Sequence, residues 1–213
     1  MFFNAHTHQQ DDLHIGIQNK YPNETPAETY YSCGIHPWYA DNWTDQINDL
    51  EKHLKNTPCV AIGECGLDKL SKVDLDTQIE CFEAQLTLAS KYNLSVIIHC
   101  VKSYDVLLGL LKKIKPQVPL VFHGFNQNIA IIKQLEPYNF YLSFGKSLLI
   151  ESSNAAKALL SLKKGNYFLE TDSDSELSIE DVYQKAAELL NLPIEKIKGN
   201  ILINSKAVFH VEF

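Results

Sequence analysis

Short apolar segments alternate with helical patterns along most of this 213-residue chain, and this alternation restricts the fold more than any other feature. The clearest helical pattern runs from Asp74 to Tyr92, where apolar residues recur at intervals of three and four. Apolar strands joined by such helices are typical of a parallel sheet that is covered on its outer face. The eight segments that we expect to be strands are residues 2–8, 13–17, 30–35, 59–63, 95–98, 120–122, 140–144 and 167–169.

Eight strands of this kind predict an α/β fold of the (β/α)8 TIM-barrel type, with a doubly wound open sheet as the alternative. The first two connections carry no helical pattern, so we expect the barrel to be trimmed there. No linker or repeat divides the sequence, which predicts a single barrel domain over residues 1–213. The expected helices are residues 45–54, 74–92, 103–114, 128–135, 155–162, 178–190 and 204–210.

The composition excludes several classes of protein. No apolar run is long enough to cross a bilayer and no signal-peptide pattern is present, so we expect a cytoplasmic monomer with no membrane partner. The five cysteines form no Cys-x-x-Cys pair, which argues against a disulfide framework or a structural zinc finger and favours buried thiols.

The charge pattern limits how the protein can bind phosphate. A net charge of -7 argues against a broad surface for nucleic acid. All 19 basic residues are lysine, so no guanidinium fork is available. Phosphate recognition would therefore depend on lysine, on backbone amides or on metal.

Two histidines two residues apart, His6 and His8, lie in the first expected strand. Side chains of a strand alternate between its faces, so both imidazoles would project from the same face. Neutral imidazole is a common ligand of zinc and other transition metals. By itself the pair is equally compatible with a mobile N-terminus that happens to contain histidine.

Four further potential ligands, Glu64, His99, His123 and Asp172, each follow an apolar strand. In parallel α/β proteins, functional residues collect at the carboxyl ends of the strands. One polar residue there is unremarkable, but six ligands on five strand ends predict a metal centre. Four imidazoles and two carboxylates can hold two divalent ions, and such a pair can activate water against a phosphodiester. We expect zinc, manganese or magnesium in this nitrogen and oxygen ligand set.

The order of several short motifs resembles the TatD-type metal-dependent deoxyribonucleases, which belong to the amidohydrolase-like barrels. The resemblance covers nearly the whole chain. Its motifs are His6-Thr7-His8, Gly34-Ile35-His36-Pro37, Gly63-Glu64-Cys65-Gly66-Leu67-Asp68, Ile98-His99, His123-Gly124-Phe125, Glu170-Thr171-Asp172 and the closing Asn204-Ser205-Lys206-Ala207-Val208-Phe209.

The resemblance implies a role for each ligand. His6, His8 and Asp172 would hold one metal together with Glu64, and Glu64 would share the second metal with His99 and His123. Asp172 would also orient or deprotonate the attacking water. Glu64 and Asp172 are therefore the expected catalytic residues.

The chain departs from the family pattern around the substrate. Asn4 replaces an aspartate, Trp38 replaces a histidine after His36-Pro37, Lys69 replaces an aromatic residue, and Lys102 lies near the position of an arginine. Residues 173–176 replace a proline-bearing segment.

These departures leave the substrate open. We expect His36 and Lys102 to bind the substrate, and Trp38 is a candidate to stack on a nucleobase. DNA or another phosphodiester is the first expectation. The alternatives are hydrolysis of another ester, a lactone or an amide, and a non-catalytic module that binds metal or nucleic acid.

Overall fold

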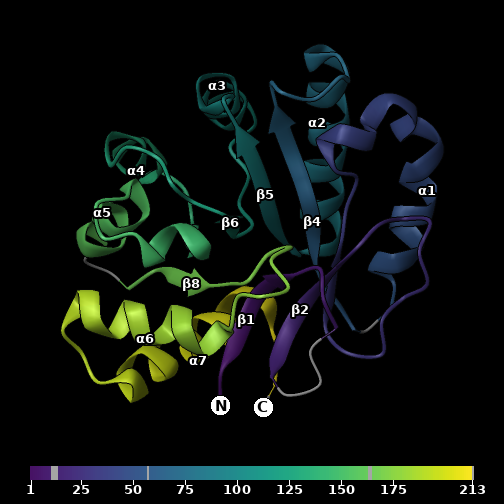
Figure 1. Cartoon of the computed structure of the whole chain (residues 1–213). Coiled ribbons are helices and arrows are strands. Elements are labelled where there is room, and N and C mark those ends of the chain that lie inside the picture. The colour runs from purple at the N-terminus through teal and green to yellow at the C-terminus, as the bar shows by residue number, and fades with distance from the viewer. Residues whose placement is uncertain (11–13, 57, 163–164, 213) are drawn as a thin grey trace.

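The computed structural model describes residues 1–10, 14–56, 58–162 and 165–212. Their strands form one parallel sheet in the order β1 to β8, with the helices around its outside (Figure 1). The predicted (β/α)8 barrel is thereby confirmed. The strands are β1 Phe3–Thr7, β2 Ile15–Lys20, β3 Tyr31–Cys33, β4 Cys59–Asp68, β5 Ser95–Val101, β6 Leu120–Phe122, β7 Phe140–Phe144 and β8 Tyr167–Leu169.

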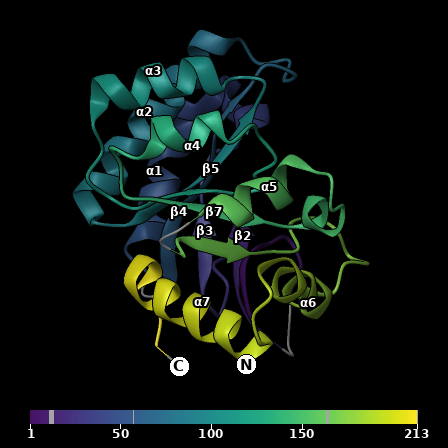
Figure 2. The same cartoon turned by 90° about the vertical axis from the view of Figure 1, so that its left-hand side faces the viewer.

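The helices cover the sheet unevenly (Figure 2). In the described parts of the β1–β2 and β2–β3 connections there is no helix, as the sequence predicts. No helix among the described residues has both the length and the apolarity needed to cross a membrane. The helices are η1 Pro37–Asn42, α1 Trp43–Leu54, α2 Leu75–Tyr92, α3 Tyr104–Ile114, α4 Ala130–Leu135, η2 Lys146–Leu149, α5 Asn154–Ser161, α6 Ile179–Leu190 and α7 Ile194–Phe209.

Local signals fix the ends of α2. The Asp74 carboxylate accepts a hydrogen bond from the backbone N–H of Asp76, which caps the first turn. Asn93 ends the helix in the left-handed conformation, with φ 52°. Ser103 occupies the predicted N-cap position of α3, but its hydroxyl donates to the Val101 carbonyl at 2.9 Å and caps no helical N–H.

Several predicted segments have the wrong bounds; the third strand, for example, ends at Cys33 and the fifth continues to Val101. The second strand begins at Ile15, not at residue 13, and continues to Lys20 because Gln18–Lys20 pair with β3. Leu13, the first residue of the predicted strand, lies outside the described residues. The last helix begins at Ile194, ten residues before the predicted start, because its first half carries lysines and Gly199 that obscure the apolar pattern.

Two other ends also differ from the prediction. The fourth strand runs on to Asp68, because its last residues pair with β5 as far as Val101. Helix α5 ends at Ser161, so Gly165, the predicted terminator, lies beyond the end of the helix.

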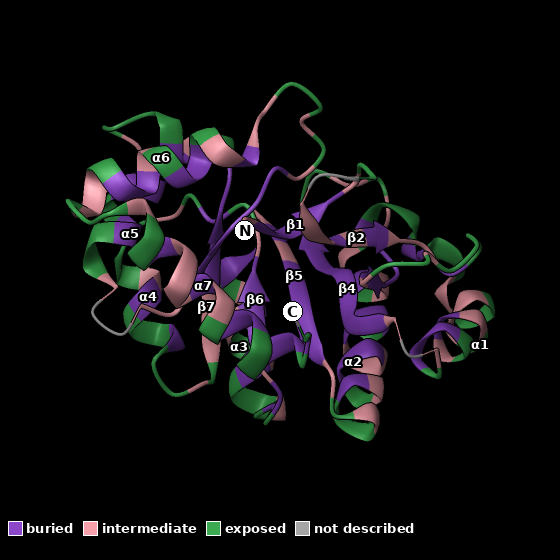
Figure 3. Ribbon diagram, turned by 90° about the horizontal axis from the view of Figure 1, so that it is seen from below, coloured by how far each residue is buried: buried purple, intermediate pink, exposed green. Residues whose placement is uncertain are grey.

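Buried residues line the strands and the inward faces of the helices (Figure 3). All five cysteines are buried and unpaired, as predicted. Burial raises the pKa of Cys59 and of Cys100 to about 12, so both remain thiols at neutral pH. These sulfur atoms therefore belong to the packed core.

The seam between β1 and β8 is closed mainly by isolated contacts. At the carboxyl ends of the two strands, the His8 N–H donates to the Asp172 carbonyl and the Asp172 N–H donates to the His6 carbonyl, each at 3.0 Å. Below them the Asn4 amide donates to the Thr171 hydroxyl at 2.8 Å and accepts from the Thr171 N–H at 3.1 Å. The seam therefore places the two N-terminal histidines beside Asp172.

The lower level of the seam depends on Tyr183 of α6. Its buried hydroxyl accepts from the Phe3 N–H at 3.1 Å and donates to the Phe3 carbonyl at 2.9 Å. This side chain therefore joins α6 to the backbone of β1 by two hydrogen bonds.

We expect Tyr183→Phe to lower the free energy of unfolding by about 1–3 kcal/mol, because the two hydrogen bonds of its buried hydroxyl are lost. Urea denaturation measures this change, and the slope of the transition should remain the same. Tyr92→Phe is the matched control, because its hydroxyl bonds to Glu51 at the surface and its loss should change little. Equal stability of the two variants would contradict this account of the seam.

Candidate metal centre

The buried carboxylate of Glu64 lies in the middle of the other five predicted ligands. Its Oε2 atom is 3.5 Å from His6 Nε2 and 3.4 Å from His8 Nε2. Its Oε1 atom is 2.7 Å from both His99 Nδ1 and His123 Nε2. The two oxygens of one carboxylate therefore face two different pairs of imidazoles.

Asp172 completes the side of the centre that Oε2 faces. Its Oδ1 atom is 3.8 Å from His6 Nε2 and 3.5 Å from His8 Nε2. The residue has a left-handed φ of 55°, and its side chain is 40 % exposed, whereas the Glu64 side chain is 4 % exposed. Asp172 is thus the carboxylate of the centre that solvent reaches most readily.

Close approach of β4 and β5 brings Glu64 to this position. A Cβ atom at Gly66 would lie 2.0 Å from the His99 carbonyl, and one at Gly63 would lie 2.6 Å from the Ile97 carbonyl. Only glycine fits these positions, where φ is 145° and 144° respectively. The Glu64 N–H donates to the Asn19 side chain at 2.7 Å, which ties the residue to β2.

Two buried glutamines of α2, seven residues apart on one helix face, hold the loops that flank the centre. The Gln85 amide accepts from the Ile35 N–H at 2.8 Å and donates to the Ile35 carbonyl at 3.1 Å. The Gln78 amide makes the equivalent pair with the backbone of Asp68, at 2.8 and 3.1 Å. Together they fix the position of Asp68 and of His36, the residue after Ile35.

The two imidazoles next to Glu64 Oε1, those of His99 and His123, each have a second carboxylate near their other ring nitrogen. Asp68 Oδ2 is 3.3 Å from His99 Nε2, and Glu170 Oε1 is 3.6 Å from His123 Nδ1. Asp68 also accepts from the Trp38 indole at 2.6 Å. Such carboxylates orient metal-binding histidines and make them stronger ligands.

Neither acid is among the predicted site residues, although both lie in motifs that resemble the family pattern. Asp68 is four residues after Glu64 in one strand, a spacing that places both on the same face. Glu170 is a single carboxylate at the end of an apolar strand. These signals could have identified both residues.

The electrostatics of the centre favour a cation. Burial opposes ionisation of Glu64, but the surrounding imidazoles, His123 foremost, hold the pKa of this carboxyl well below its usual value. Burial likewise opposes protonation of His123, yet Glu64 and Glu170 raise the pKa of this imidazole well above its usual value. A metal ion would therefore displace a proton from His123, so rising pH favours metal binding.

The residues fit divalent metal. Neither ring nitrogen of the buried His6 has a hydrogen-bond partner among the described residues. Nitrogen and oxygen donors without sulfur suit zinc, manganese and related ions. Among the described residues there are three groups whose ligand atoms all lie within 4.8 Å of one another. The groups are His6 with His123 and Asp172, His6 with His8 and Glu64, and His36 with Glu64 and His99.

The two predicted substrate-binding residues lie in different surroundings. His36 is buried within the centre, where its Nε2 atom is 3.4 Å from Glu64 Oε1, and burial lowers the pKa of its imidazole. Lys102 directly follows β5 with φ 52°, and its side chain is exposed. The structure thus brings His36 into the cluster and leaves Lys102 at the surface.

The largest departures from the family pattern also have structural roles. Asn4, in place of an aspartate, bonds to Thr171 across the seam and so positions the residue before Asp172. Trp38, in place of a histidine, donates to Asp68. Lys69, in place of an aromatic residue, pairs with Asp105 at 3.0 Å.

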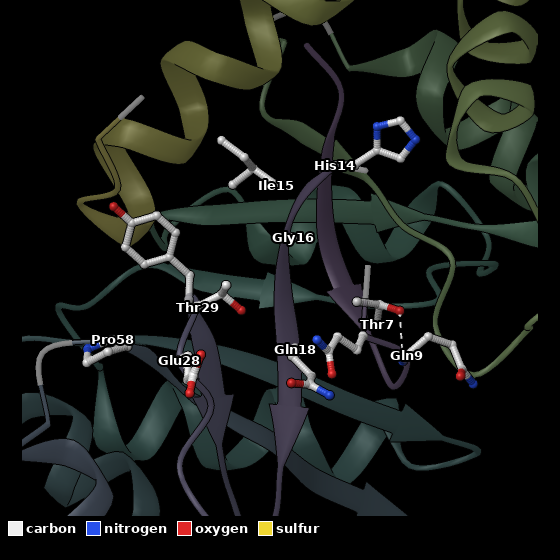
Figure 4. Close-up of a pocket in the computed structure, with 11 residues that line it drawn as sticks. Thr7, Gln9, His14, Ile15, Gly16, Gln18, Glu28, Thr29 and Pro58 are labelled. Carbon is white, nitrogen blue, oxygen red and sulfur yellow. Dashed lines mark hydrogen bonds between the residues drawn. The ribbon is translucent and has the colours of Figure 1, made fainter. Parts of the chain in front are cut away.

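A cavity of about 580 Å³ lies beside β2 (Figure 4). It is lined by residues of β2 such as Ile15 and Gln18, and by Thr29 and Tyr30 from the connection to β3. None of the six predicted ligands lines it. The cavity lies where a complete barrel would carry helices.

Comparison with known proteins gives a consistent result. The sequence profile of the family described as "TatD related DNase" matches residues 14–210. A Haemophilus influenzae protein named as an uncharacterized metal-dependent hydrolase is 34% identical over 160 residues, which cover 70% of this chain and 60% of that protein. A Pantoea ananatis protein named "3'-5' ssDNA/RNA exonuclease TatD" is 36% identical over 97 residues, 44% of this chain and 37% of that protein. The chain thus matches about 60% or less of the length of these two relatives.

Solved structures share the fold. The crystal structure of YjjV, a TatD homologue from Escherichia coli K12, superposes with a TM-score of 0.83 over 99% of this chain and 98% of that chain, at 22% identity. A TatD-family hydrolase from Entamoeba histolytica gives a TM-score of 0.77 over 98% of this chain and 97% of that chain, at 15% identity.

We expect Asp68→Asn to weaken metal binding by about 10- to 100-fold, because His99 loses the carboxylate that orients it. Calorimetric titration of chelator-treated protein with Zn²⁺ or Mn²⁺ measures the affinity. Asp105→Asn, which removes an exposed carboxylate paired only with Lys69 in the described chain, is the control and should bind as the wild type does. Unchanged affinity in Asp68→Asn would exclude this supporting role.

Proposed function

This chain belongs to the family of TatD-related DNases, and we propose that it is a metal-dependent hydrolase that cleaves phosphodiester bonds of DNA at a binuclear centre. One observation carries the proposal. The two carboxylate oxygens of Glu64 face separate ligand sets, with His6, His8 and Asp172 around one oxygen and His99 and His123 around the other.

In this proposal the ligand residues hold two divalent ions of the zinc, manganese or magnesium kind. Such ions supply charge that activates water and stabilises the leaving oxygen of a phosphodiester. Glu64 bridges the two ligand sets and stays ionised because of the imidazoles around it. Asp68 keeps the ring of His99 in its binding orientation, and Glu170 places negative charge beside His123.

Asp172 is the proposed general base. It is the most exposed carboxylate of the centre, so water and substrate can reach it, and it lies beside His6 and His8. The backbone bonds of the seam fix its position. A carboxylate held in this way can orient the attacking water and accept its proton.

One comparison supports nucleic acid as the proposed substrate, and the composition indicates how the chain would bind it. A related protein carries the name of a single-stranded DNA and RNA exonuclease. The acidic chain has no arginine, so its hold on a phosphodiester would depend on metal, on His36 and on lysines such as Lys102. This manner of binding needs no broad basic surface.

We expect Asp172→Asn to lower the rate of hydrolysis of single-stranded DNA by about 10²–10⁴-fold while the fold is retained. The assay uses chelator-treated protein reloaded with Zn²⁺, Mn²⁺, Mg²⁺ or Co²⁺, and circular dichroism checks the fold. Asp174→Asn is the matched control, since this carboxylate lies two residues away and pairs with Lys146. It should keep the wild-type rate.

Two results would contradict the proposal. If Asp172→Asn cleaves DNA at the wild-type rate, Asp172 is not the general base. Failure of the wild type to cleave any phosphodiester with any of the four metals, together with hydrolysis of carboxylic esters, lactones or amides, would assign the centre to the wider amidohydrolase-like chemistry.

A further inference from the structure

Two aromatic side chains are exposed beside the metal centre. Trp38 is 55% exposed and Tyr39 is 50% exposed, and both belong to η1, which directly follows His36. Single exposed apolar residues are common on protein surfaces, but these two are adjacent in sequence and lie next to His36 of the centre. Neither residue has a role in the function proposed above except through the bond of the Trp38 indole to Asp68.

Trp38 is exposed but firmly held. Its backbone N–H donates to His36 Nδ1 at 3.1 Å, and its indole N–H donates to Asp68 Oδ2 at 2.6 Å. Pro37 restricts the backbone at the start of η1. The indole therefore loses little conformational entropy when a ligand packs on it.

The aromatic pair is one imidazole away from the bridging carboxylate. The ring centroid of His36 is 5.5 Å from that of Trp38 and 5.9 Å from that of Tyr39, and its Nε2 atom is 3.4 Å from Glu64 Oε1. The ring of Tyr21, the residue after β2, packs edge-on against the ring of Tyr39, with 5.4 Å between the ring centroids. A group bound at the centre would thus lie next to these rings.

We propose that Trp38 and Tyr39 form a stacking platform for an unpaired nucleobase adjacent to the bond that is cleaved. The inference rests on the proposed phosphodiesterase function, because a phosphodiester at the centre places a base within reach of the pair. Aromatic rings bind unpaired bases of any sequence by stacking. Stacking also adds affinity without positive charge, which suits a chain with a net charge of -7 and no arginine.

Three variants separate stacking from the support of Asp68. Trp38→Ala removes both the ring and the indole N–H. Trp38→Phe keeps an aromatic face but cannot donate to Asp68. Tyr39→Ala removes a ring and leaves the bond between Trp38 and Asp68 intact.

The binding assay measures fluorescence anisotropy of a labelled 12-residue oligothymidylate, with an abasic oligomer of equal length as the comparison and Ca²⁺ as the metal. We expect the wild type to prefer the thymidylate. Tyr39→Ala should bind the thymidylate roughly 5- to 150-fold more weakly and should bind the abasic oligomer as before, and Trp38→Ala should lose more affinity for the thymidylate than for the abasic oligomer. Trp38→Phe should keep most of the preference. Ile203→Ala, which trims an apolar side chain that is 69% exposed on α7, is the control and should change nothing.

Several results would overturn the platform. One is that the wild type does not prefer the thymidylate. Another is that the variants lose equal affinity for both oligomers. A third is that Trp38→Phe loses as much affinity as Trp38→Ala while Tyr39→Ala loses none. The last result would assign Trp38 to the support of Asp68 alone. A base preference that depends on Trp38 and Tyr39, in a protein that cleaves no phosphodiester, would instead support the platform and contradict the proposed hydrolysis.

Discussion

The structure depends on one buried carboxylate, that of Glu64, surrounded by imidazoles. Burying a carboxylate is costly unless opposite charge or hydrogen bonds compensate. In the protein without metal, part of this compensation is the proton that Glu64 and Glu170 hold on His123. A divalent ion would supply the same compensation with more charge. The requirement for positive charge beside Glu64 therefore connects the burial of this residue with the chemistry proposed for it.

The remainder of the barrel keeps the ligands around this carboxylate. Glycines bring β4 against β5, and two glutamines of α2 fix the backbone on either side of the centre. The closing seam holds the ends of β1 and β8 together, so that ligands more than 160 residues apart in sequence become neighbours. Because the seam consists of only a few bonds, residues such as Asn4 and Tyr183 have importance that their chemistry alone would not suggest.

Much of this arrangement is predictable from the sequence, and the exceptions have physical reasons. Apolar runs such as 120–122 and 167–169 are buried on both faces, so their pattern identifies the strands with the correct bounds. Strand β2 is partly exposed and ends in Gln18–Lys20, so its bounds follow from pairing with β3, which no local pattern reveals. The spacing of Asp68 from Glu64 and the place of Glu170 at the end of a strand mark both acids as candidates for the centre. Which imidazole each one meets is tertiary information that the sequence does not contain.

The central claim is that Glu64 lies between two cations. Anomalous scattering from crystals soaked in Mn²⁺ or Zn²⁺ tests it most directly. The account predicts two peaks, one between Glu64 Oε2 and the His6, His8 and Asp172 side chains, and one between Glu64 Oε1 and the His99 and His123 side chains. Soaked crystals without a peak at Glu64, or with a single ion that only one of its oxygens contacts, would contradict it.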